Sequence, residues 1–101
     1  MIRIGIGYDI HKLKEGLPLF IGGINIKSIL GSAGHSDGDA LIHAIVDSLL
    51  GAAGLGDIGK FFPSDDEKWR DAKSDIFLSE VERMIVPVSY THLTLPTKRI
   101  V

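Results

Sequence analysis

The sequence has no cysteine, no excess of positive charge and no long apolar run. The missing cysteine excludes disulfides and thiolate metal sites. Eleven basic residues against thirteen acidic ones leave a formal charge of −2, which provides no electrostatic basis for binding nucleic acid. No apolar stretch approaches the roughly 20 residues of a membrane span, and residues 1–5 lack the apolar region of a signal peptide, so we expect a cytoplasmic protein. With 101 residues, of which 45% are apolar, we expect one small globular domain.

The first predicted element is a strand over residues 2–11. Apolar side chains occupy one parity of this segment, and glycine or polar side chains occupy the other. Asp9 and His11 belong to the polar parity. Both side chains should therefore project from the same face of the strand.

A turn, a hairpin and a loop are predicted next. Residues 12–17 are polar and predict a turn. Residues 19–26 predict two short strands around Gly22-Gly23, which is a strong hairpin signal. Residues 27–34, rich in glycine and serine, predict a loop.

Two helices are predicted further along the chain. The first covers residues 36–53, where Ser36 is a candidate N-cap and Asp39 completes a pattern like a capping box. Its apolar residues recur at helical spacing. A second helix is predicted for residues 74–85. Residues 86–101 contain two prolines and only weak alternation, which favours an irregular extended segment.

Possible metal ligands concentrate in the first half of the sequence. Asp9 and His11 come from the predicted strand and His43 from the first predicted helix. A carboxylate and two imidazoles suit zinc, and three protein ligands leave the fourth position open, as in catalytic sites. Asp39, one turn before His43, could accept a hydrogen bond from a histidine and orient its ring. The alternatives are that Asp9 and His11 form a solvated pair and that His43 is structural, because spacing alone does not bring strand and helix together.

The start of the first predicted helix is a second candidate site. Ser36, Asp37 and Asp39 precede and open this helix, where free N–H groups can bind an anion. Capping alone also accounts for Ser36. Residues 56–59 and 64–67 have similarly plain interpretations, as a turn and a solvated acidic loop.

Four segments taken together resemble the 2-C-methyl-D-erythritol 2,4-cyclodiphosphate synthase family. They are GIGYDIH at 5–11, GHSDGDALIHA at 34–44, GAAGLGDIGK at 51–60 and FPSDD at 62–66. Their order and spacing match the family over about residues 1–85. The resemblance implies an α/β fold of the α+β sandwich type, in which helices pack on one face of a sheet. It also implies a homotrimer with sites between subunits.

The resemblance implies an enzyme of the non-mevalonate route to isoprenoids, a phosphorus–oxygen lyase. Such an enzyme converts 4-diphosphocytidyl-2-C-methyl-D-erythritol 2-phosphate to the cyclic diphosphate and releases CMP. The 2-phosphate attacks the β-phosphorus, a reaction that mainly needs positioning and neutralisation of phosphate charge. The expected partner is therefore a small nucleotide-diphosphate substrate, in the cytoplasm or in a plastid.

By motif position, Asp9, His11 and His43 match the family's zinc ligands. Zn²⁺ or another divalent ion held there would polarise the β-phosphate, so Asp9 and His11 also count as substrate-binding residues. This ligand assignment is implied by the resemblance and not by the spacing of the three residues, which left the alternatives above open.

The resemblance implies roles for further residues that match the family's motifs. His35 and Ser36 match residues near the substrate phosphate, and with Asp39 they form the predicted catalytic set. Asp39 is placed behind the metal ligands. The remaining predicted substrate-binding residues are Asp57, Ile58, Gly59, Phe62, Ser64 and Asp66.

The family domain is longer than this chain. Residues 86–101 show no match and are predicted to be a non-family tail, artefactual or disordered. In the family the later parts supply the cytidine pocket, a threonine pair and a glutamate for a second divalent ion, Mg²⁺ or Mn²⁺, and no residue here is assigned to those roles. We therefore expect a fragment that folds poorly and does not turn over. The competing interpretations are a non-catalytic metal- or phosphate-binding fragment and a small interaction module with structural histidines.

Overall fold

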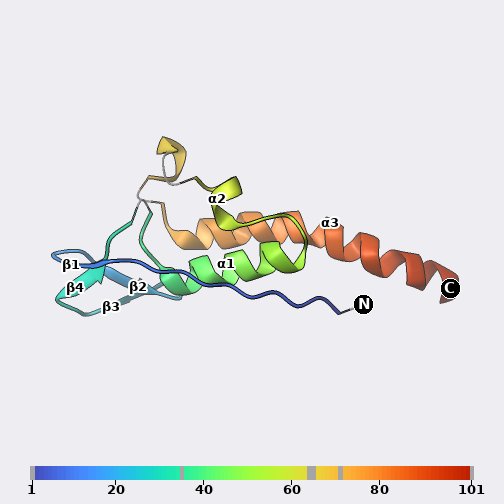
Figure 1. The fold of residues 1–101 in the computed structure, drawn as a ribbon, viewed down its shortest axis with the longest axis horizontal. Helices are drawn as coiled ribbons and strands as arrows, with labels where there is room; N and C mark the ends of the chain where they lie inside the picture. Colours follow the sequence, from blue (N-terminus) through green and yellow to red (C-terminus); the bar gives the residue numbers. More distant parts are fainter. Residues whose placement is uncertain (1, 35, 64–65, 71, 101) are drawn as a thin grey trace.

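Two small antiparallel ladders lie at one end of the molecule, and two helices extend away from them side by side (Figure 1). The computed structural model describes residues 2–34, 36–63, 66–70 and 72–100, and for residues 88–100 it describes the backbone alone. The elements of the described chain are β1 (Leu13–Glu15), β2 (Leu19–Ile21), β3 (Ile24–Ile26), β4 (Leu30–Ser32), α1 (Ala40–Ala52), α2 (Ile58–Phe61), the 3₁₀ turn η1 (Glu67–Trp69) and α3 (Ser74–Ile100). This α+β architecture confirms the predicted class.

The hairpin formed by β2 and β3 confirms the sequence prediction. Leu19 pairs with Ile26, and the connection is the two residues Gly22 and Gly23. Their φ values of 63° and 82° lie in the left-handed region, which a type I′ turn requires at both central positions. Glycine is the residue that takes this conformation without steric cost.

The other ladder was not predicted. Residues 12–17 and 27–34, expected as a turn and a loop, each contain a three-residue strand, β1 and β4, with Leu13 opposite Ser32. Strands this short have too few residues to show alternation, so only the partner identifies them. A Cβ on Gly31 would lie 2.1 Å from the Leu17 carbonyl oxygen, which explains the glycine in β4.

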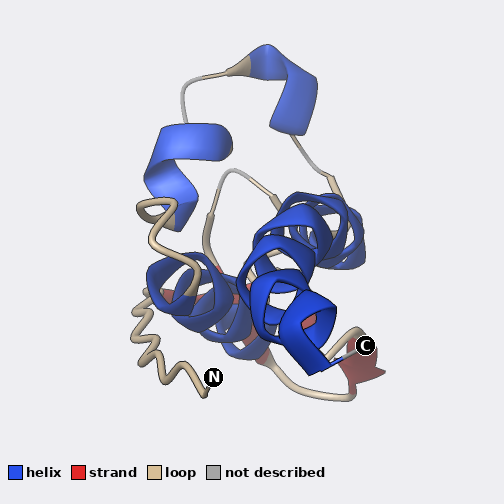
Figure 2. Ribbon diagram, turned by 90° about the vertical axis from the view of Figure 1, so that its right-hand side faces the viewer, coloured by secondary structure: helices blue, strands red, loops and turns tan. Residues whose placement is uncertain are grey.

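The predicted strand at residues 2–11 is wrong, because residues 2–12 form no strand in the structure. The segment instead runs beside α1 (Figures 1 and 2). A helix has no free row of backbone groups with which a strand could pair. The two sides of the segment do differ, but not as expected. The side that carries Gly5 and Gly7 faces α1, whereas the apolar side chains on the other side are 73–90% exposed. These exposed residues are Ile2, Ile4, Ile6, Tyr8 and Ile10.

Helix α1 begins later than predicted. Its N-cap is Asp39 rather than Ser36, and the Asp39 carboxylate accepts from the Ile42 N–H at 3.1 Å. The helix ends at Ala52, as expected, and is followed by Gly54 at a φ of 71°.

The core lies where α1 and α3 pack together. Ile42, Val46 and Leu50 repeat every four residues on α1 and are buried, so one side of the predicted apolar stripe lies in the core. Leu41 and Ile45, on the flank of that stripe, remain 47% and 40% exposed. The side chains that α3 and the α2 region add to the cluster are Phe77, Val81 and Phe62.

Helix α3 is much longer than predicted. It was expected to end near Ile85, with an extended segment beyond it, but it continues to Ile100. A proline inside a helix removes one hydrogen bond and crowds the carbonyl group four residues earlier, and α3 continues through Pro87 and Pro96 in spite of this cost. Glycine follows the end of α1 and helps to terminate it, whereas the sequence after Gly59 contains no glycine that could end α3 in the same way. The domain boundary at residue 85 stays a prediction. None of the described helices is long and apolar enough to cross a membrane.

Candidate metal centre

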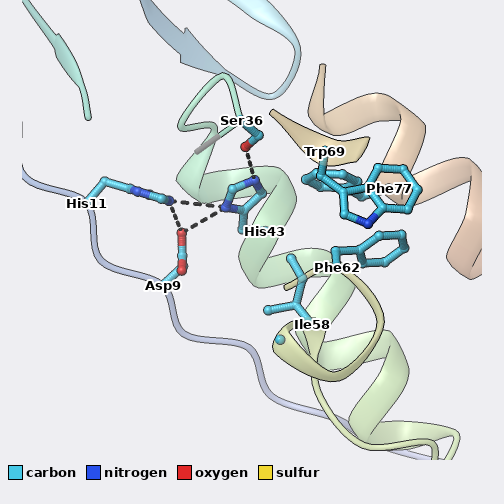
Figure 3. Close-up of a pocket in the computed structure, with 9 residues that line it drawn as sticks. Asp9, His11, Ser36, His43, Ile58, Phe62, Trp69 and Phe77 are labelled. Carbon is cyan, nitrogen blue, oxygen red and sulfur yellow. Dashed lines mark hydrogen bonds and ion pairs between the residues drawn. The ribbon is translucent and has the colours of Figure 1, made fainter. Parts of the chain in front are cut away.

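Asp9, His11 and His43 converge on one point, as the family resemblance implied (Figure 3). Asp9 Oδ2 lies 2.6 Å from His11 Nε2 and 3.3 Å from His43 Nδ1. The two imidazole nitrogens lie 3.1 Å apart. The interpretation of Asp9 and His11 as an isolated solvated pair is therefore wrong, because a helix 32 residues away supplies the third group.

The hydrogen bonds behind His11 determine which of its ring nitrogens faces the site. His11 Nδ1 lies 3.1 Å from the Ala33 carbonyl oxygen, which can only accept. Nδ1 of the neutral ring therefore carries the hydrogen, and Nε2 presents a lone pair toward Asp9 and His43.

This arrangement fits a divalent cation. Asp9 Oδ2 is buried and has no hydrogen-bond partner in the described chain, although a ring nitrogen lies 2.6 Å away. A carboxylate oxygen and a bare nitrogen repel each other unless a proton or a metal lies between them. Ligands of a tetrahedral Zn²⁺ with bonds of about 2.0–2.1 Å lie about 3.3 Å apart, close to two of the three separations.

Burial keeps His43 in the form that can bind a metal. Its side chain is buried on α1, and desolvation lowers the pKa of the imidazole below its ordinary value of 6.5. His11 nearby lowers this pKa further, while the carboxylates of Asp9 and Asp37 oppose the shift. The neutral ring, which is the ligating form, therefore dominates at neutral pH.

Glycine at position 7 brings Asp9 to the helix. A Cβ on Gly7 would lie 1.6 Å from the Ala44 carbonyl oxygen of α1, a distance no backbone tolerates. We expect Gly7→Ala to push the segment away from α1 and to weaken metal binding by about tenfold or more, the effect of a misplaced ligand shell. Titration with Co²⁺ or Zn²⁺ measures the change. Gly51→Ala is the matched control, because a Cβ there meets nothing within 4 Å and alanine favours the helix. Equal affinities for the two variants would contradict this role of Gly7.

The three groups open into a cavity of about 210 Å³. Four of the predicted substrate-binding residues line it, namely Ser36, Ile58, Gly59 and Phe62, and the Ser36 hydroxyl lies 3.2 Å from His43 Nε2 (Figure 3). Typical small-molecule pockets have volumes of about 300–1,000 Å³. The cavity is therefore smaller than a typical small-molecule pocket.

Two predicted substrate-binding residues do not line this cavity. Asp57 caps α2 by accepting from the Lys60 N–H, and Asp66 caps η1 by accepting from the Lys68 N–H. Both are exposed. His35 and Ser64, also predicted, lie outside the described residues.

Asp39 does not orient a histidine, which corrects its predicted place behind the metal ligands. It is fully buried, and its oxygens accept from Gly22 N–H at 3.0 Å, Gly23 N–H at 2.6 Å and Ile42 N–H at 3.1 Å. Asp39 therefore fixes the β2–β3 hairpin to the start of α1, and the described chain provides no contact through which it would serve in catalysis.

Sequence analysis missed three residues at or behind the cavity, Trp69, Phe77 and Ser74, and gave Asp37 only a role at the start of the first helix. Trp69 and Phe77 line it, with ring centroids 5.4 Å apart. Ser74 contacts His43 Nε2 at 2.7 Å and Asp37 contacts Ser74. The sequence predicted Ser74 only as the first residue of the second helix, and nothing in its spacing pointed to His43.

Comparison with known proteins identifies the family of this chain. The family described as "YgbB family" matches residues 2–95. The 2-C-methyl-D-erythritol 2,4-cyclodiphosphate synthase of Koribacter versatilis is 53% identical over 89% of this chain, which spans 58% of the relative's length. A solved structure of an enzyme of this name superposes with a TM-score of 0.78 at 50% identity, over 84% of this chain and 57% of the other. A form of that name with bound CDP gives 0.77, at the same identity and coverage. The convergent ligand set and these likenesses together show that the chain belongs to the YgbB family.

Proposed function

We propose that this chain carries the metal- and phosphate-binding half of a cyclodiphosphate synthase site. The reaction would convert 4-diphosphocytidyl-2-C-methyl-D-erythritol 2-phosphate to 2-C-methyl-D-erythritol 2,4-cyclodiphosphate with release of CMP, as a phosphorus–oxygen lyase. The convergence of Asp9 Oδ2, His11 Nε2 and His43 Nδ1 supports this proposal most directly. The full protein would be a homotrimer and would use a second ion, Mg²⁺ or Mn²⁺, whose ligand is not assigned in this chain.

The residues of the cavity would act mainly by positioning. Asp9, His11 and His43 would hold a divalent ion, most simply Zn²⁺, which supplies Lewis-acid polarisation of a phosphate oxygen. Ser36 borders the same space and can donate its hydroxyl to a phosphate oxygen. Ile58, Phe62, Trp69 and Phe77 form apolar walls that limit water near the phosphate. None of the described lining residues is lysine or arginine, so charge neutralisation falls to the metal site.

A second candidate is a metal- and phosphate-binding fragment without turnover. Two observations favour it: the cavity of about 210 Å³ is smaller than a typical small-molecule pocket, and the chain spans only 58% of the length of the Koribacter versatilis relative. The interaction module with structural histidines is the third alternative, and metal analysis separates it from the other two. One bound zinc per chain would exclude that module.

Turnover tests the two remaining candidates. We expect the chain as written to release no CMP above the blank, while the Koribacter versatilis enzyme serves as the positive control in the same assay. Family-like turnover by this chain would contradict the inactive-fragment interpretation.

A chimera tests the assignment of the reaction itself. Residues 1–85 joined to the remaining length of the Koribacter versatilis enzyme should release CMP, because the combined chain would restore the full length of the domain. The same chimera carrying His11→Ala should lose this activity. Equal turnover with and without His11 would remove this residue from the proposed site.

A further inference from the structure

The second nitrogen of His43 enters a hydrogen-bonded chain that the proposed reaction does not use. His43 Nε2, on the side of the ring away from Asp9 and His11, lies 2.7 Å from the Ser74 hydroxyl. Ser74 is the first residue of α3 and is fully buried. Its hydroxyl donates to Asp37 Oδ1, and its N–H donates to Asp37 Oδ2 at 2.8 Å.

Asp37 is itself fixed in place. Its N–H donates to the Ala72 carbonyl oxygen at 3.0 Å, and its Oδ1 accepts from the Asp39 N–H at 3.0 Å. The carboxylate therefore presents both oxygens to Ser74 in one orientation. The chain Asp37–Ser74–His43 connects the loop before α1, the start of α3 and the candidate metal centre.

The donor of each hydrogen bond in the series Asp37–Ser74–His43 follows from the available hydrogens. A carboxylate can only accept, so the Ser74 hydroxyl donates its hydrogen to Asp37. The Ser74 oxygen then offers a lone pair to His43, and Nε2 must carry the hydrogen. A neutral imidazole protonated at Nε2 is bare at Nδ1, which is the nitrogen that faces Asp9 and His11.

We propose that Asp37 and Ser74 are positioning residues that fix the Nε2–H form of His43 and so aim its Nδ1 lone pair at the metal. This inference rests on the proposed metal site. Groups behind a metal-binding histidine orient the ring and select its protonated nitrogen, and their loss typically costs about 10–100-fold in metal affinity. The role that the sequence suggested for Asp39 is thus taken by Ser74, which accepts from His43 and is itself held by Asp37.

Metal titration tests the proposal on the full chain. Ser74→Ala should weaken Co²⁺ binding by about 10–100-fold and change the visible absorption of bound Co²⁺. Ser74→Thr, which keeps the hydroxyl, should restore most of the affinity. Ser79→Ala is the matched control on the same helix, because its exposed hydroxyl donates only to the Asp75 carbonyl oxygen, and it should leave the affinity unchanged.

The protonated ring nitrogen can be read without any metal. Nitrogen-15 NMR of the metal-free protein at pH 8 should show His43 protonated at Nε2. In Asp37→Asn the side-chain amide can donate to Ser74, which frees the serine hydroxyl to donate to His43, so the spectrum should shift toward the Nδ1–H form. This variant keeps the shape of the side chain and decides the question if Ser74→Ala does not fold.

The outcomes separate this proposal from the proposed function. A wild-type chain that binds no Co²⁺ or Zn²⁺ would overturn both. Wild-type binding with unchanged affinity in Ser74→Ala, or an unchanged ring in Asp37→Asn, would overturn only the positioning role. Loss of affinity in Ser36→Ala with none in Ser74→Ala would also overturn it and would give the Nε2 contact to Ser36, whose hydroxyl lies at 3.2 Å.

Discussion

Replacing Asp9 by alanine is expected to reduce Zn²⁺ and Co²⁺ affinity by at least about 100-fold. This loss exceeds the roughly 10–100-fold effect of removing a group that only hydrogen-bonds to a metal ligand. Asp9 supplies the only carboxylate of the three-residue set, and its buried Oδ2 has no hydrogen-bond partner in the described structure. The variant would leave two imidazoles to hold a dication without a compensating negative charge. Isothermal titration and metal content after gel filtration measure the effect.

The matched control removes a carboxylate that lies elsewhere. Asp75 is exposed in the first turn of α3 and does not line the metal cavity, so Asp75→Ala should bind one metal ion per chain like the wild type. His43→Ala should behave like Asp9→Ala, because each removes one ligand from the same centre. Full metal binding by Asp9→Ala would refute the ligand set, whatever the likeness to relatives.

The metal ligands could be predicted because only a few types of side chain can bind a dication, whatever the fold. Asp9, His11 and His43 combine suitable donors with the motifs of one family. Spacing placed Asp9 and His11 on one side of their segment, which the structure confirms. It could not show that His43 lies beside them, because that contact depends on how residues 2–10 pack on α1.

The packing of residues 2–10 illustrates what sequence periodicity leaves open. Alternation identifies an apolar and a polar side but does not say which side faces the protein. Here the decisive feature is the glycine parity: Gly5 and Gly7 approach the α1 backbone so closely that any side chain would collide with Ser48 or Ala44. Close approach of glycine to a helix, rather than burial of isoleucine, fixes the segment.

The partners of Asp37 and Asp39 were beyond sequence reasoning for a different reason. Aspartate and serine near a helix start are usually explained by capping, and capping does account for part of what Asp39 does. Their other partners are distant in sequence: Ser74 lies 37 residues after Asp37, and Gly22 lies 17 residues before Asp39. No local pattern encodes such pairs, so only the assembled fold assigns them.

Asp39→Ala is expected to lower the free energy of unfolding by about 3–5 kcal/mol. Hydrogen bonds to a charged group contribute about 1.5–3 kcal/mol each, they are not additive, and an unfilled N-cap costs about 1 kcal/mol. The substitution would remove, from a fully buried position, the carboxylate that accepts from the Gly22, Gly23 and Ile42 N–H groups. Small domains have total stabilities of about 5–15 kcal/mol, so much of the fold would be lost. Urea unfolding followed by circular dichroism measures the change.

Two further variants distinguish the buried position of Asp39 from capping in general. Asp57→Ala removes an exposed cap that accepts from one N–H, that of Lys60, and should cost only about 1 kcal/mol. Asp39→Asn keeps one oxygen as an acceptor but directs an amide donor at a backbone N–H, so its stability should fall between those of the wild type and Asp39→Ala. If Asp39→Ala destabilised the chain no more than Asp57→Ala, the hairpin would not depend on this carboxylate, and the contact between β2 and α1 would have to be maintained by side-chain packing alone.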